Sequence, residues 1–168
     1  MNVFRSATWT SCLLGGVLLA TAMAIGDQAG PAGREFIRIR PDQMKWVKQP
    51  DGMGVEVAVV EGDPAKPAYY ATMVHFPPGV MSRPHYHPEE RYCVVLKGTW
   101  YTGTNDQFTP ETAVPLKVGS YMRHPAGGHH YDGAKEEDVI VMISGYGPSK
   151  NLVLDNGPLF GRSMPAKK

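Results

Sequence analysis

The chain has 168 residues, which is long enough for one domain with a sizeable hydrophobic core. Its 17 basic and 16 acidic side chains give a formal net charge of +1 at pH 7 with neutral histidines. A balance this close to neutral provides no electrostatic attraction for nucleic acid or for an acidic membrane. We therefore expect a single module whose partner is not a nucleic acid.

The first 24 residues have the pattern of a secretory signal peptide. A positively charged lead of five residues precedes the apolar run CLLGGVLLATAMAI (residues 12–25), and Ala22-Met23-Ala24 matches an A-x-A cleavage site. The alternative is an uncleaved membrane anchor, but the run is short for a span of about 20 apolar residues. We predict cleavage after Ala24, a periplasmic or secreted location, and a mature chain that is not held in a membrane.

Cleavage would also change the charge and the cysteine count. Removal of residues 1–24 takes away one basic residue, Arg5, and leaves 16 basic and 16 acidic side chains. It also takes away Cys12, so the remaining cysteine, Cys93, has no partner for an internal disulfide. Because Cys93 lies in the apolar run from Tyr92 to Leu96, we expect a buried and inert thiol.

The rest of the chain divides into a flexible lead-in at residues 25–34, a folded domain at residues 35–160 and a C-terminal tail at residues 161–168. Within the domain, short segments rich in β-branched and aromatic residues alternate with glycine and proline turns, and none has helical periodicity over three turns. Residues 42–48 fit either a short strand or one helical turn, and residues 103–115 indicate a polar loop. Strands are predicted at residues 35–40, 55–60, 68–76, 92–96, 99–102, 120–124, 129–132, 139–146 and 152–154. This succession predicts an all-β sandwich or barrel.

Two motifs contain most of the candidate functional residues. The first is GVMSRPHYHPEERYCVVLKG (residues 79–98), which contains His85 and His87, and the second is GSYMRHPAGGHH (residues 119–130), which ends at His130. Side chains at positions i and i+2 of a strand project from the same face, so the first two imidazoles would point into one space. Such a pair is half of a metal site.

The spacings of both motifs resemble those of the cupin superfamily, and the resemblance extends from about residue 39 to residue 146. It implies a single-domain bacterial cupin, a jelly-roll β-barrel in which His85, His87 and His130 hold a divalent transition metal. Imidazole suits Fe, Mn, Ni, Cu and Zn, and three histidines leave positions open for water, dioxygen or a small-molecule substrate. His129 is the alternative to His130, because adjacent strand residues face opposite sides. The resemblance also implies association into a homodimer through edge strands.

The chain departs from the cupin pattern at residue 91, which usually has a glutamate ligand and here has Arg91. A guanidinium about 5 Å from a divalent ion would be repelled by roughly 6–7 kcal/mol at an effective dielectric of about 20. Three outcomes are open. In the first, Arg91 swings outward or pairs with a carboxylate, and Glu90 or Glu89 becomes the fourth ligand. In the second, three histidines hold the metal and Arg91 binds an anionic substrate. In the third, the pocket holds no metal.

Two functions of different classes fit these features. One is an exported enzyme that oxidises, decarboxylates or isomerises a small organic molecule, which is anionic if Arg91 binds it, with Arg91 and Tyr101 as candidate catalytic residues. The other is a non-catalytic module that binds a small ligand or a metal. His75 and His124 are not motif positions, and we place neither in the site.

Overall fold

A computed structural model describes residues 36–163 of the chain, and within this range the protein is built almost entirely of β-strands. The predicted signal peptide and lead-in lie outside the described residues. Two 3-10 helices, η1 (Pro41–Gln43) and η2 (Pro110–Thr112), are the only helical turns in residues 36–163. The strands are β1 (Val47–Lys48), β2 (Glu56–Gly62), β3 (Tyr69–Phe76), β4 (Val80–Ser82), β5 (His85–Tyr86), β6 (Arg91–Lys97), β7 (Trp100–Gly103), β8 (Val114–Leu116), β9 (Tyr121–His124), β10 (Tyr131–Gly133), β11 (Val139–Tyr146), β12 (Leu152–Val153) and β13 (Phe160–Arg162).

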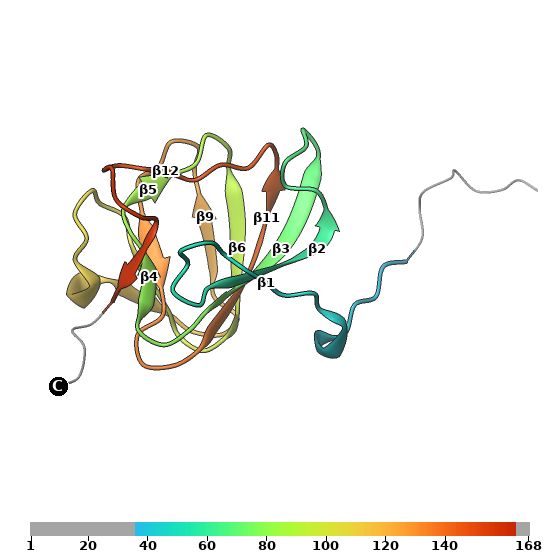
Figure 1. The fold of residues 1–168 in the computed structure, drawn as a ribbon, viewed down its shortest axis with the longest axis horizontal. Helices are drawn as coiled ribbons and strands as arrows, with labels where there is room; N and C mark the ends of the chain where they lie inside the picture. Colours follow the sequence, from blue (N-terminus) through green and yellow to red (C-terminus); the bar gives the residue numbers. More distant parts are fainter. Residues whose placement is uncertain (1–35, 164–168) are drawn as a thin grey trace, which may run out of the picture. The chain divides into compact units, whose positions relative to one another are not determined.

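The strands form two main antiparallel sheets with many crossovers between them. The larger sheet has the order β1-β2-β3-β11-β6-β9, the second has the order β13-β4-β10-β7-β8, and β12 pairs with β5. Figure 1 shows β2, β3, β11 and β6 side by side in the larger sheet. The all-β prediction is confirmed, and the arrangement is that of a jelly-roll domain.

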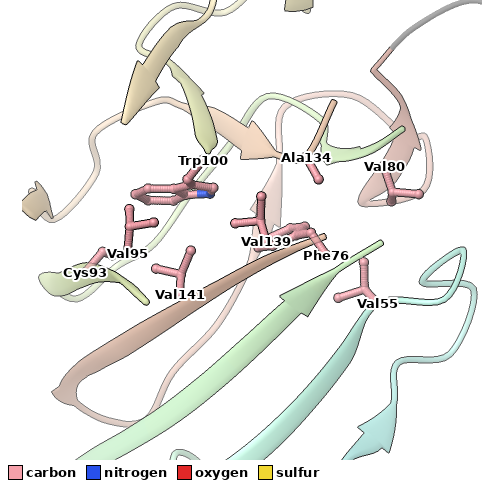
Figure 2. Close-up of a cluster of buried hydrophobic side chains, with 9 residues drawn as sticks. All are labelled: Val55, Phe76, Val80, Cys93, Val95, Trp100, Ala134, Val139 and Val141. Carbon is pink, nitrogen blue, oxygen red and sulfur yellow. The ribbon is translucent and has the colours of Figure 1, made fainter. Parts of the chain in front are cut away.

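The core lies between the two sheets and takes residues from both. Val95 and Val141 point inward from the larger sheet, and Trp100 on β7 meets them from the second sheet, each 1% exposed or less (Figure 2). Alternation along β6 explains this, because every second side chain faces the core. Cys93 belongs to the same cluster and is fully buried, which confirms the prediction for its position.

Most predicted strands are present, with ends shifted by one or two residues. The segment 139–146 coincides with β11, whose eight residues pair with all eight residues of β3. Residues 42–48 contain both alternatives that were considered, since η1 lies at the start of the segment and β1 at its end.

Three sequence predictions of local structure were wrong or incomplete. Residues 36–40 are not in a strand, because alternation alone supplies no pairing partner and β1 already occupies the free edge of β2. The predicted loop at residues 103–115 contains η2 and the start of β8. Strands β4 and β13 were not predicted, and β5 was expected only as the extended segment of His85 and His87; each has two or three residues, too few for a periodic pattern. Strand β13 also extends into the segment predicted as a tail.

None of the helical turns in residues 36–163 is long and apolar enough to cross a membrane.

Candidate metal centre

Three histidines of the two motifs meet inside the barrel. His85 lies on β5, and the main chains of His85 and His130 exchange two hydrogen bonds of 2.9 Å. Residues paired in this way place their side chains on the same face. His87 returns to that face two positions after His85, as the i, i+2 rule predicts. The three imidazoles are 1–4% exposed, and their ring centroids are 4.3–4.8 Å apart.

Each of these imidazoles is fixed in one tautomer by a backbone carbonyl. The Nδ1–H groups of His85, His87 and His130 donate to carbonyl oxygens at 2.8, 2.9 and 3.0 Å, respectively. A carbonyl can only accept, so in the neutral ring the proton is on Nδ1 and the Nε2 lone pair is free. Carbonyls that orient histidines in this way are typical of metal sites.

The surroundings keep the three rings neutral. Burial lowers the pKa of His85 to about 3, and the neighbouring His130 adds to the effect. Burial also lowers the pKa of His87, with Arg91 as the second cause, and it lowers the pKa of His130. At neutral pH, three uncharged imidazoles therefore lie close together.

The geometry of these atoms fits a metal ion. Nε2 of His87 and Nε2 of His130 are 3.2 Å apart, and with both protons on Nδ1 there is no hydrogen between them. Two nitrogens bound to zinc at about 2.0–2.1 Å with tetrahedral angles lie about 3.3–3.4 Å apart. A cation between the lone pairs would replace their repulsion with attraction. His85, His87 and His130 could therefore hold a metal ion.

A fourth histidine and a carboxylate lie beside this group, and the sequence reasoning missed both. His124, at the end of β9, is 2% exposed, and its ring centroid is 3.8 Å from that of His130. Asp132 is 5% exposed, and its Oδ2 is 3.6 Å from Nε2 of His130. Burial raises the pKa of Asp132 and lowers that of His124. The available signal for His124 was alternation, since it shares a face with Met122, which packs against the core.

Arg91 is buried but does not point a free guanidinium at the histidines. Its Nε and Nη2 donate to Oε1 of Glu89 at 3.1 and 2.9 Å, and Nη2 also donates to Ser149 and to the carbonyl of Lys150. A further bond runs from Nη1 to the side chain of Asn151. Of the outcomes considered, the structure has Arg91 paired with a carboxylate.

Neither glutamate considered as a fourth ligand lies in the donor group. Oε1 of Glu89 is taken by Arg91, and its other oxygen is buried without a hydrogen-bond partner in residues 36–163. Glu90 is on the surface, where it accepts from Tyr92 and pairs with Arg123 at 3.6 Å.

Tyr101 and His129 lie outside the cavity. The Tyr101 hydroxyl donates to Glu136, and Nδ1 of His129 bonds to Asp106 at 2.7 Å with the imidazole 38% exposed. Placement of His130 inward and His129 outward follows the alternation expected of adjacent strand residues.

A cavity of about 190 Å³ opens onto the histidines. This volume is below the roughly 300–1,000 Å³ of pockets for drug-sized ligands, so the occupant is small. Its lining combines polar and apolar side chains. The polar residues include Ser82, His85, His87, Arg91, His124 and Asp132, and the apolar residues include Val55, Val57, Val74, Phe76 and Ile143.

Comparison with known proteins agrees with this architecture. The chain is similar in structure to the polyketide cyclase RemF from Streptomyces resistomycificus (17% identity, 73% of this chain and 89% of that chain, TM-score 0.57). It is also similar to a cupin-2 domain from Rhodospirillum rubrum (14% identity, 73% and 84%, TM-score 0.56) and to a structure of DMSP lyases (16% identity, 62% and 57%, TM-score 0.51).

At these identities the likenesses show the fold, which is that of the cupins. No curated protein matches the chain. The family of ChrR cupin-like domains matches residues 34–150, which is more than half of the sequence. The chain therefore belongs to the ChrR cupin-like family of the cupins.

Proposed function

We propose that the protein is an exported, metal-dependent enzyme that acts on a small organic molecule in the barrel cavity. His85, His87 and His130 hold one divalent transition metal. The observation that carries the proposal is that all three rings donate Nδ1–H to carbonyls, which leaves their Nε2 atoms bare, and that one ring nitrogen of each residue lies within 4.8 Å of those of the other two. Core histidines without this role would need partners for those nitrogens.

The bound metal would act as a Lewis acid or as a centre for dioxygen. The chain itself supplies the surroundings. The apolar residues of the cavity lining would bind the hydrocarbon part of the substrate. Arg91 is a positioning residue, because the Lys150 carbonyl that accepts from Arg91 also accepts Nδ1–H of His87. Its contacts with Glu89 and Ser149 leave little capacity for the bidentate substrate contact considered above.

Enzymes among the similar structures support a catalytic function. One is a polyketide cyclase and another is a DMSP lyase, both named for reactions of small molecules. Their identities to this chain are too low to transfer a substrate, so oxidation, decarboxylation and isomerisation stay open.

The second candidate, a non-catalytic module for a small ligand or metal, is favoured by one observation. Neither candidate catalytic side chain presents a free functional group to the cavity, since Arg91 is bound to the protein and Tyr101 lies on the outside.

Metal content tests the metal-binding part of the proposal. The mature chain, residues 25–168, purified without chelator is compared with its His87→Ala and His129→Ala variants by elemental analysis. We expect one metal per chain in the parent and in His129→Ala, whose imidazole faces outward, and less than about a tenth of that in His87→Ala. A parent chain that stays below about a tenth of an equivalent after reconstitution would exclude the metal centre.

Dioxygen uptake and product formation across a panel of small aromatic and keto acids then separate the two functions. Turnover that depends on the metal and is lost in His87→Ala supports the enzyme. Silence across the panel with stoichiometric metal supports the binding module.

Export is a separate part of the proposal and rests on the pattern of residues 1–24. The full chain is expressed, and the cells are fractionated. We expect a periplasmic or secreted protein whose intact mass, measured by mass spectrometry, is that of residues 25–168. A cytoplasmic protein with its full mass would contradict export, and a full-length protein in the membrane fraction would favour the uncleaved anchor.

A further inference from the structure

We propose that His124 is a fourth metal ligand that takes the place of the glutamate usual at the position of Arg91. This inference deepens the proposed metal function and rests on it. It concerns one residue outside both motif patterns and makes the centre one of four histidines.

Strand register places His124 at the required point. Arg91 begins β6 and His124 ends β9, and the two residues are direct partners in the antiparallel pairing of these strands. Side chains of directly paired residues lie on the same face, about 4.5–5.5 Å apart at Cβ. The His124 ring therefore enters the barrel interior beside the position that a glutamate at residue 91 would occupy.

The contacts of His124 leave it ready to bind a ligand. His124 is 2% exposed, and both of its ring nitrogens are buried without a hydrogen-bond partner in residues 36–163. A buried imidazole without partners is costly, so an unmet partner is expected. The ring also lines the cavity and lies 5.8 Å from the His87 ring, centroid to centroid.

The charges nearby agree with this exchange of ligands. Arg91 and Glu89 form a buried pair at 2.9 Å, so they neutralise each other, and residue 91 adds no negative charge to the metal. Four neutral imidazoles form a nitrogen-only donor set, which suits Zn²⁺, Cu²⁺ and Ni²⁺ better than Mn²⁺. Asp132 is the competing donor, because its Oδ2 is 3.6 Å from Nε2 of His130 and because His124, His130 and Asp132 form a second group whose ligand atoms lie within 4.8 Å of one another.

A measurement on the unmodified protein tests the donor set directly. The mature chain is loaded with one Cu²⁺, and the coordinated nitrogens are counted from the electron paramagnetic resonance hyperfine pattern. The proposal expects coupling to four imidazole nitrogens. Coupling to three or fewer would overturn it.

Variants then identify the fourth nitrogen. His124→Phe keeps a ring of similar size, and His129→Phe is the matched control on the outer face. The proposal expects Zn²⁺ affinity, measured by competition with a chromophoric chelator, to fall about 100-fold or more in His124→Phe and to stay unchanged in His129→Phe. The copper spectrum of His124→Phe should lose one nitrogen.

Two further readouts separate a ligand from a structural residue. Thermal unfolding of the metal-free variants should show His124→Phe as stable as the parent or more stable, since two unpartnered polar atoms are removed. Unchanged affinity in His124→Phe, or a loss confined to Asp132→Asn, would overturn the inference. If the parent chain binds no metal at all, the proposed function fails as well, and this outcome is distinct from a three-nitrogen centre.

Discussion

At the level of single residues, residue 91 is an arginine where cupins usually have a glutamate ligand, and its side chain makes hydrogen bonds that support the site. Arg91 connects Glu89, in the first motif, to residues 149–151 near the end of the domain. Through the Lys150 carbonyl, it also steadies the tautomer of His87. The positive charge of Arg91 would repel a metal ion, so Arg91 supports the site indirectly, through the Lys150 carbonyl that it shares with His87.

Arg91→Met should destabilise the protein by about 3–5 kcal/mol, because it leaves the Glu89 carboxylate buried without its partner. The matched control is Arg123→Met, whose ion pair with Glu90 is exposed and contributes less than about 1 kcal/mol. Urea unfolding of both variants measures the difference. Similar losses in the two variants would contradict the buried-pair interpretation. Arg91→Met combined with Glu89→Gln should recover part of the stability.

Cys93 should resist thiol reagents in the folded mature chain. Its side chain is fully buried, and burial raises the pKa of its thiol, so little reactive thiolate forms. Labelling with a disulfide reagent at neutral pH should be slow in buffer and complete in concentrated guanidinium. Fast labelling in buffer would mean that β6 opens easily.

At the level of elements, the turns between strands set the register that brings the histidines together. Gly98 connects β6 to β7 with φ of +71°, and a Cβ added there would collide with the carbonyl of Asp138. Gly119 precedes β9 with φ of +86°, but a Cβ there meets nothing within 4 Å. Both glycines have a left-handed backbone conformation, but only Gly119 has room for a Cβ.

Gly98→Ala should therefore cost more stability than Gly119→Ala. Both variants pay about 1–2 kcal/mol for a left-handed alanine, and only Gly98→Ala must also move the backbone near Asp138. We expect a gap of at least about 1 kcal/mol between the two in urea unfolding. Equal losses would show that the backbone around Asp138 adjusts without cost.

The sequence predicted the longer elements and missed the shortest. β11 and β3 were predicted because eight residues of β-branched and aromatic character give a clear pattern. β5 has two residues and pairs with β12, which lies more than 60 positions later, so no local signal gives its length or its partner. The segment that carries the first two histidines is extended because its partner strand holds it there.

At the level of the whole molecule, burial of several neutral histidines connects stability to pH. The pKa values of His85, His87, His124 and His130 are all lowered in the folded state, that of His85 to about 3. The unfolded chain takes up protons on these groups near pH 6.5, where the folded chain does not. The contribution of these four histidines to the free energy of unfolding is therefore complete above pH 6.5 and is lost as the pH falls toward 3. The raised pKa of Asp132 acts in the opposite direction, but it is one group against four.

The metal-free mature chain should accordingly lose stability between about pH 7 and pH 5, by up to about 1.4 kcal/mol per pH unit for each histidine. Urea unfolding in the presence of EDTA measures this slope. A flat profile over this range would contradict the buried, neutral state of the four rings.

The sequence by itself determined the all-β class, the burial of Cys93 and the inward pair His85 and His87. Each of these follows from a local pattern: alternation along strands, an apolar run, or the two-residue repeat of side-chain direction. Spacing across both motifs also selected His130 in preference to His129, through the resemblance to the cupins.

Only the tertiary structure decided that His124 joins the cluster and that Arg91 binds Glu89 and residues 149–151. The first depends on the register between β6 and β9, and the second on contacts about 60 positions apart in the chain. Neither register nor long-range contact is encoded in a local pattern, because both are set by how the strands pack together.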